Sequence, residues 1–180
     1  MEKHRVQRDW DIHFMKEARL WANMSKCLSR KIGSVLVRDK RVIATGYNGP
    51  PSGVPHCDFR DDTGGYTDHF ISDKCPRHRM GFGSGKGMEH CVAVHSEINP
   101  IIQAARQGLV TTGATLYAYC GIPCTNCMKE IIQAGILRIV CLDKNRGDTS
   151  KSDYNFPLSE QLCKVAGIQL DMIPEGEIDA

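Results

Sequence analysis

His95-Ser96-Glu97 and Pro123-Cys124-Thr125-Asn126-Cys127 are the two stretches that decide the fold and the chemistry of this chain. Cys124 and Cys127 are three residues apart, so at the start of a helix both thiolates can face one metal ion. The positive end of the helix dipole favours the thiolate form there. His95 would supply a third, nitrogen ligand. Three protein ligands leave one position of a tetrahedral zinc ion open, which is typical of a catalytic zinc site.

Glu97 follows His95 by two residues, and this separation predicts a different role for it. At a helix start, one side chain can reach the metal while the other reaches a water molecule in the open position. Zinc lowers the pKa of such a water towards neutrality. A carboxylate beside it can accept the proton and pass it to a substrate without binding the metal. The alternative is a purely structural zinc bound by Cys124, Cys127 and distant residues, with Glu97 uninvolved.

The overall composition is that of an ordinary globular protein. The 180 residues are 41% hydrophobic and 24% charged, with a formal net charge of +2, so a nucleic-acid partner is not expected. No stretch approaches the roughly 20 apolar residues that cross a bilayer, and the first residues lack the apolar core of a signal peptide. We therefore expect a cytoplasmic protein with no membrane partner. The nine cysteines, an odd number, indicate metal binding rather than disulfides.

Hydrophobic periodicity predicts alternating helices and strands after an initial hairpin. Helices are expected over about 10–27, 96–108, 124–134 and 156–166, and strands over 32–37, 41–44, 114–119, 136–142 and 168–173. This order predicts an α/β fold, a mixed, mostly parallel sheet with helices on both faces. One domain over 1–180 is expected, with a long segment at about 50–94 that lacks periodicity. A bound metal would order such a segment.

The spacing H-x-E followed by P-C-x-x-C is the signature of zinc deaminases. Beyond this signature, the chain resembles the deoxycytidylate (dCMP) deaminases of phages, bacteria and eukaryotes from about residue 10 to 170. The loop Gly46-Tyr47-Asn48-Gly49-Pro50-Pro51-Ser52-Gly53 is specific to that family. The further matching stretches are Ser25-Lys26-Cys27, Lys31-Ile32-Gly33, His95-Ser96-Glu97-Ile98-Asn99, Ala104-Ala105-Arg106-Gln107-Gly108 and Ile132-Gln133-Ala134-Gly135-Ile136.

The resemblance implies a cytidine-deaminase-like fold with three α/β/α layers, a five-stranded mixed sheet and assembly into homo-hexamers. It also implies zinc-dependent hydrolysis of dCMP to dUMP and ammonia, which supplies dUMP for thymidylate synthesis. Glu97 would protonate N3 of the ring and then the leaving amine. Activation by dCTP and inhibition by dTTP with Mg²⁺ are implied as well. If a phage encodes the protein, its location would be the host cytoplasm.

The resemblance also implies roles for individual residues. Asn48 would contact the sugar, Arg106 the 5′-phosphate, and Tyr119 and Tyr154 the base or the phosphate. An effector segment would consist of Ser29, Arg30, Lys31, Tyr47, Asn48, Gly49 and Gly53. Alternatives remain open: Arg106 as a solvated helix residue, Tyr119 as a packed strand residue, and the glycine-rich loop as a tight turn.

Two positions depart from the family pattern. Ser96 stands where an alanine is usual, and its backbone amide is still expected to bind the pyrimidine carbonyl of the substrate. Pro100 stands where a helix former is usual. If the helix begins at about Val94, Pro100 falls in its second turn and is expected to bend it, with consequences for Arg106.

A second, structural zinc is expected in the aperiodic segment. The predicted ligands are Cys27, His56, Cys75 and Cys91, with Cys57 or His90 as a substitute for one of them, and the resemblance implies a similar arrangement. Free buried cysteines are the alternative. Cys120, Cys141 and Cys163 lie in strand or helix patterns and are predicted to belong to the core.

Three other functions compete with dCMP deamination. An enzyme that edits nucleic acid, such as a tRNA adenosine deaminase, shares the zinc motif but is expected to carry a basic face. A non-enzymatic zinc-binding module would have two fully ligated zinc sites and a replaceable Glu97. Within the deaminase interpretation, dCTP or cytidine remains an alternative substrate, because one arginine does not define a phosphate pocket.

Overall fold

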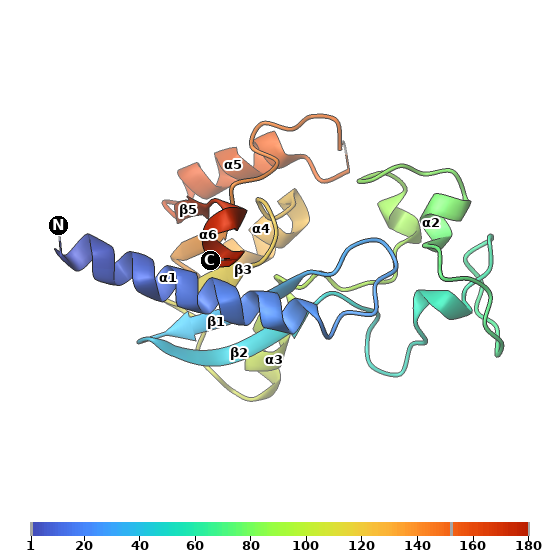
Figure 1. Ribbon diagram of the computed structural model, residues 1–180, viewed down its shortest axis with the longest axis horizontal. Coiled ribbons are helices and arrows are strands. Elements are labelled where there is room, and N and C mark those ends of the chain that lie inside the picture. Colours follow the sequence, from blue (N-terminus) through green and yellow to red (C-terminus); the bar gives the residue numbers. More distant parts are fainter. Residues whose placement is uncertain (1, 152, 180) are drawn as a thin grey trace.

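A computed structural model describes residues 2–151 and 153–179 (Figure 1). Its centre is a five-stranded sheet in the order β2-β1-β3-β4-β5. The strands are β1 (Gly33–Arg38), β2 (Arg41–Tyr47), β3 (Thr115–Ala118), β4 (Arg138–Leu142) and β5 (Gln169–Ile173). β1 pairs antiparallel with both β2 and β3, whereas β3, β4 and β5 run parallel. The predicted five-stranded mixed sheet is confirmed.

The hairpin between β1 and β2 follows from its two turn residues. Asp39 and Lys40 have φ angles of 53° and 58°, so both take the left-handed conformation that the twist of a two-residue hairpin requires. β2 extends to Tyr47, three residues beyond the predicted end. It therefore leads directly into the glycine-rich loop.

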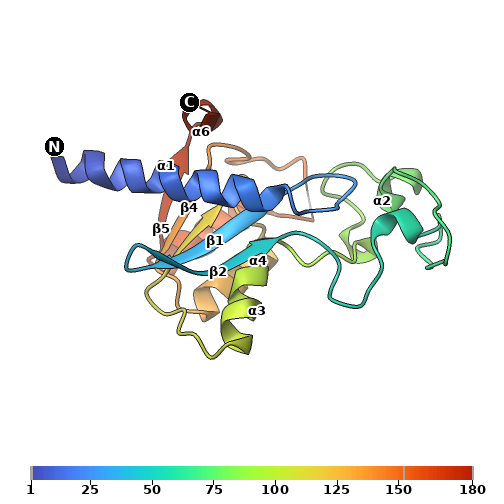
Figure 2. The ribbon, with the colours of Figure 1, turned by 60° about the horizontal axis from the view of Figure 1, so that its bottom comes forward.

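Helices cover both faces of the sheet, as predicted (Figure 2). On one face, α1 (Glu2–Ala22) and α6 (Glu175–Asp179) pack on the sheet through Phe14, Met15, Ala18 and Ile178. On the other lie α3 (Asn99–Arg106), α4 (Thr125–Gln133) and α5 (Phe156–Val165). α1 begins well before the predicted start, because the sequence before Trp10 shows no apolar pattern of helical spacing. α6 was not predicted.

α3 begins later than the sequence indicated. Ile98 and Asn99 both donate backbone hydrogen bonds to the carbonyl of His95, each at 3.2 Å, and form a turn before the helix. Pro100 consequently lies in the first turn of α3, where its missing N–H is not needed. The prediction that Pro100 lies in the second turn and bends the helix is therefore wrong.

The segment from 50 to 94 lies beside the sheet, at the right of Figure 1. Its helical parts are short turns at Cys57–Phe59 and Met88–His90 and the one-turn helix α2 (Pro76–Arg79). A pair of backbone hydrogen bonds between Gly49 and Val94 closes its base. Inside it, buried Arg60 donates to the carbonyls of Gly64 and His90, so a side chain supplies order where periodic structure is sparse.

Within residues 2–151 and 153–179, none of the helices combines the length and the apolar character that crossing a membrane requires.

Candidate active site

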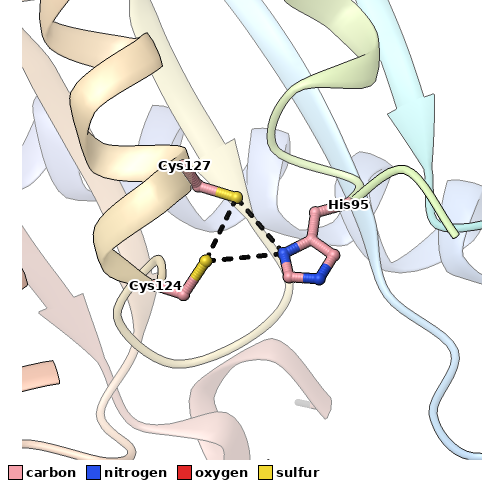
Figure 3. Close-up of side chains that lie close together, drawn as sticks. All are labelled: His95, Cys124 and Cys127. Carbon is pink, nitrogen blue, oxygen red and sulfur yellow. Dashed lines mark hydrogen bonds between the residues drawn. The ribbon is translucent and has the colours of Figure 1, made fainter. Parts of the chain in front are cut away.

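His95, Cys124 and Cys127 form a compact triad of ligand atoms (Figure 3). His95 Nδ1 lies 3.3 Å from Cys127 Sγ and 3.6 Å from Cys124 Sγ, and the two sulfurs are 3.5 Å apart. Ordinary zinc bond lengths place ligands about 3.5 Å (N to S) and about 3.8 Å (S to S) apart on a tetrahedron. The triad thus fits zinc with little movement, and its donor set is that of an open, three-ligand site.

The start of α4 positions both sulfurs. Cys124 is the N-cap residue of α4 and Cys127 lies in its first turn, as predicted. Thr125 ties this end to the chain before α5, because its backbone N–H donates to the carbonyl of Tyr154 at 2.9 Å. The two sulfurs consequently project from the positive end of α4, and the hydrogen bond from Thr125 to Tyr154 holds this end in place.

Hydrogen bonds within the triad shift the pKa values of Cys124 and His95 in opposite directions. A hydrogen bond shared with Cys127 lowers the pKa of Cys124 to about 4. A hydrogen bond to Cys124 in turn raises the pKa of His95 to about 9, against the effect of burial. The Cys124 thiolate therefore lies beside a protonated His95 imidazole. Zinc binding would release the protons of the ligand atoms, because zinc ligands bind in their deprotonated forms.

Packing against the hairpin fixes the turn that carries His95. Ser34 Oγ on β1 donates to the carbonyl of Ser96. A Cβ atom at Gly46 on β2 would lie 2.5 Å from Pro100 Cδ and 2.7 Å from the Ser96 carbonyl. Only glycine therefore allows β2 to approach this turn so closely.

Glu97 lines the same pocket as His95 and Cys124 and is 4% exposed. Ser96 Oγ donates to its Oε2 at 2.9 Å, and the thiol of Cys120 donates to its Oε1 at 3.8 Å. Both carboxylate oxygens thus have a neighbouring donor, which aims the group into the pocket.

Cys120 is a site residue that the sequence interpretation missed. Cys141 and Cys163 are buried in the core as predicted, but Cys120 lines the pocket instead. Its place directly after the end of β3, on the segment that leads to the zinc cysteines, was the available signal.

Several residues predicted to bind substrate or effector share this pocket, namely Ser29, Arg30, Asn48, Ser96 and Tyr154. Asn48 Nδ2 donates to the Arg30 carbonyl at 2.9 Å, and its Oδ1 accepts from Ile32 N–H at 2.8 Å. One N–H and one lone pair of the amide remain for a ligand. The roles of these five residues stay predictions, and the structure shows that they line the pocket of Glu97.

Other predicted residues lie elsewhere. Arg106 is exposed on α3 and lines a separate surface cavity with Tyr47 and Gly49. The hydroxyl of Tyr119 donates to Glu175 at 3.1 Å, on the sheet face that α1 covers. Lys31 lines a third surface pocket, and Gly53 is exposed with a φ of 86°. Within one chain, the structure does not bring these residues into the pocket of Glu97.

Four cysteines gather at the base of the 50–94 segment. Burial raises the pKa of Cys57, and the charges of Cys91, Cys27 and Cys75 all act on it. His56 is exposed and shares a surface pocket with Cys27. Among the described residues, only His95, Cys124 and Cys127 bring three ligand atoms within 4.8 Å of one another. The second group is therefore a looser cluster than the triad.

Comparison with known proteins agrees with this geometry. Residues 8–143 match the family model of the cytidine and deoxycytidylate deaminase zinc-binding region. The deoxycytidylate deaminase of Enterobacteria phage T4 is 32% identical, over 90% of this chain and 89% of its own. That of Schizosaccharomyces pombe is 34% identical over 94% of this chain, and the chain spans 46% of its length.

Among solved structures, the dCMP deaminase of cyanophage S-TIM5 in complex with dCMP and dUMP has a similar fold. Its TM-score is 0.63 at 21% identity, over 89% of this chain and 94% of that one. The match to the family model covers the zinc-binding region, and the structure brings three ligand atoms together there. His95, Cys124 and Cys127 are therefore the zinc ligands of this family. The chain belongs to the cytidine and deoxycytidylate deaminase family.

Proposed function

We propose that the protein hydrolyses dCMP to dUMP and ammonia. The single observation that carries the proposal is a buried carboxylate, Glu97, in one pocket with the zinc ligands His95 and Cys124. Relatives named deoxycytidylate deaminases support the choice of substrate. In this reaction a water oxygen bonds to C4 of cytosine, the bond from C4 to the amine breaks, and ammonia leaves.

Zinc at the triad supplies a Lewis acid that lowers the pKa of water to a value near neutrality. The remaining work falls to Glu97. Its carboxylate accepts one proton from the attacking water and delivers it to N3 of the ring. It then accepts the second proton from the hydroxyl now bonded to C4, which becomes the carbonyl, and delivers it to the leaving amine. General acid and base steps of this kind contribute about 10²- to 10⁴-fold each.

Neighbouring groups hold the carboxylate and the substrate in place. Ser96 Oγ and the Cys120 thiol keep Glu97 oriented. We propose that the backbone amide of Ser96 binds the pyrimidine carbonyl and that the spare donor of Asn48 binds the sugar. Tyr154 lies edge-on to His95 with ring centroids 6.2 Å apart, and so forms a wall of the pocket beside the triad.

The test is ammonia release from dCMP, dCTP, deoxycytidine and adenosine, measured in parallel on the purified zinc protein. We expect turnover of dCMP, and loss of nearly all of it in Glu97→Gln with the zinc content unchanged. Glu130→Gln, an exposed glutamate on α4, is the matched control. Retained turnover in Glu97→Gln would remove Glu97 from the mechanism.

A structural zinc in the 50–94 segment is a second part of the proposal. Cys27, Cys75 and Cys91 would bind it, and the gathering of these cysteines around Cys57 favours Cys57 over the exposed His56 as the fourth ligand. Four closed positions would order the segment. We expect elemental analysis to find two zinc ions per chain. The number should fall to one in Cys57→Ser but not in His56→Ala. One zinc in the unmodified protein would contradict it.

Regulation and assembly are proposed from the family resemblance. dCTP would activate and dTTP with Mg²⁺ would inhibit, through the residues predicted as the effector segment. In the structure, Tyr47 and Gly49 line one surface cavity together with Arg106. Residues of both β2 and α3 line this cavity. A homo-hexamer would be seen by sedimentation, and the effectors would change dCMP turnover in opposite directions.

A further inference from the structure

The pocket of Glu97 is also lined by two arginines, Arg30 and Arg77, that zinc chemistry does not require. Arg30 precedes β1, and Arg77 comes from α2 in the 50–94 segment. Glu97 is the only carboxylate among the residues that line the pocket. Besides the zinc ligands His95 and Cys124, the charged groups that line the pocket are two guanidinium groups and one carboxylate, an excess of positive charge that suits an anionic ligand.

Arg77 is buried but only partly satisfied. It is 4% exposed, and one guanidinium nitrogen donates to the carbonyl of Lys86 at 2.6 Å. Its Nε has no hydrogen-bond partner, and no described carboxylate forms a salt bridge with it. A buried cation without an anion costs several kcal/mol in typical proteins. A ligand that brings negative charge would relieve this cost.

Arg30 is connected to the zinc triad through the side chain of Tyr154. Its guanidinium donates to the Tyr154 hydroxyl at 3.3 Å, and the Tyr154 ring stands edge-on to His95. Its backbone carbonyl is held by Asn48 Nδ2. Arg30 is therefore separated from the metal ligand His95 by the side chain of Tyr154.

We propose that Arg77 and Arg30 bind the 5′-phosphate of the nucleotide and so select a cytosine monophosphate over the nucleoside. This inference rests on the proposed function and assigns the phosphate to a different arginine from the sequence-based candidate, Arg106. Planar guanidinium groups match phosphate oxygens in two-point hydrogen bonds. Arg77 brings a buried, desolvated donor, and Arg30 an exposed one that is hydrogen-bonded to Tyr154.

The competing explanation is that Arg77 only ties α2 to the carbonyl of Lys86. A structural tie would affect every substrate equally, whereas a phosphate anchor would affect only ligands that carry phosphate. The comparison of dCMP with deoxycytidine separates the two explanations.

The experiment uses the zinc-loaded full chain and the variants Arg77→Gln and Arg30→Gln. Arg41→Gln, an exposed arginine on β2 outside the pocket, is the matched control for loss of a positive charge. We expect kcat/KM for dCMP to fall about 10- to 100-fold in each variant, mostly through KM, as for loss of a hydrogen bond to a charged group. For deoxycytidine, kcat/KM should stay within about twofold of the unmodified protein.

A second measurement does not depend on turnover. Calorimetric binding of dUMP and deoxyuridine to the same proteins should show that dUMP loses its advantage in both variants. Arg77→Lys keeps the charge and a donor for Lys86, and we expect it to recover part of dUMP binding. It also carries the test if Arg77→Gln fails to fold.

Three outcomes would overturn the proposal. These are equal losses for dCMP and deoxycytidine, unchanged dUMP binding in both variants, or a loss confined to Arg106→Gln. If the unmodified protein deaminates no cytosine compound, the proposed function fails. The arginine assignment is then still judged by dUMP against deoxyuridine binding.

Discussion

Replacing Asp11 with asparagine is a small chemical change that should lower the free energy of unfolding substantially. It lies in α1, is 4% exposed, and receives two parallel hydrogen bonds from Arg138 on β4, both at 2.7 Å. Tyr117 and Gln7 donate to the same carboxylate at 2.9 and 3.0 Å. This network ties α1 to the middle of the sheet.

The expected cost of Asp11→Asn follows from what remains. Removing one partner of a buried ion pair costs about 3–5 kcal/mol. Arg138 keeps a second partner, because its Nε donates to Asp171 at 2.7 Å, so we expect the lower end, about 3 kcal/mol. Domains of this size shift by about 2–4 °C per kcal/mol, which predicts a fall in Tm of about 6–12 °C.

Urea denaturation of the zinc-loaded protein, followed by circular dichroism, measures this cost directly. Asp9→Asn, on an exposed position of the same helix, is the matched control. The double variant Asp11→Leu/Arg138→Met removes both charges and should be more stable than Asp11→Asn. A loss below about 1 kcal/mol for Asp11→Asn relative to the control would refute the reasoning, because even a single charged hydrogen bond is worth about 1.5 kcal/mol.

Three further predictions concern acid stability, the zinc turn and Glu97. Burial raises the pKa of Asp11, but hydrogen bonds led by the one from Arg138 outweigh this effect and hold the pKa below its usual value. The stability that Asp11 contributes is therefore complete above about pH 4 and is lost as the pH falls further. The free energy of unfolding measured against pH should show this loss in the unmodified protein but not in Asp11→Asn. Gly46→Ala should lower zinc content and kcat together, because the added Cβ would displace the turn that carries His95; Gly176→Ala, with nothing within 4 Å, should change neither. Cys120→Ala should lower kcat about 3- to 10-fold with KM unchanged, as Glu97 loses a positioning donor, and an unchanged kcat would contradict this.

The zinc triad could be predicted from the sequence because zinc chemistry admits few residue types. Histidine and cysteine at those spacings, each near a helix start, leave few other interpretations, and the structure brings them together. The sheet was predictable for a similar reason, since apolar runs of strand length alternate with helical patterns.

Arg77 and Cys120 could not be predicted in the same way. Arg77 lies on a helix of four residues in a segment without periodicity, so no pattern indicated which way it faces. Cys120 follows a strand at the point where the chain leaves the sheet, and a strand pattern cannot tell the last core residue from the first pocket residue. Arg106 was given a role by a matching motif, and within one chain it is exposed outside the pocket of Glu97, so its role stays a prediction.

The order of the strands explains why distant segments build one pocket. Because β1 runs antiparallel to β2 and β3, its start lies at the same edge of the sheet as their ends. Residues 29–32, 48 and 120–124, which contribute part of the pocket wall, are therefore neighbours in space. The bridge between Gly49 and Val94 returns the chain to this edge just before His95. The 50–94 segment can consequently add Arg77 to the wall of the pocket that also contains His95 and Cys124.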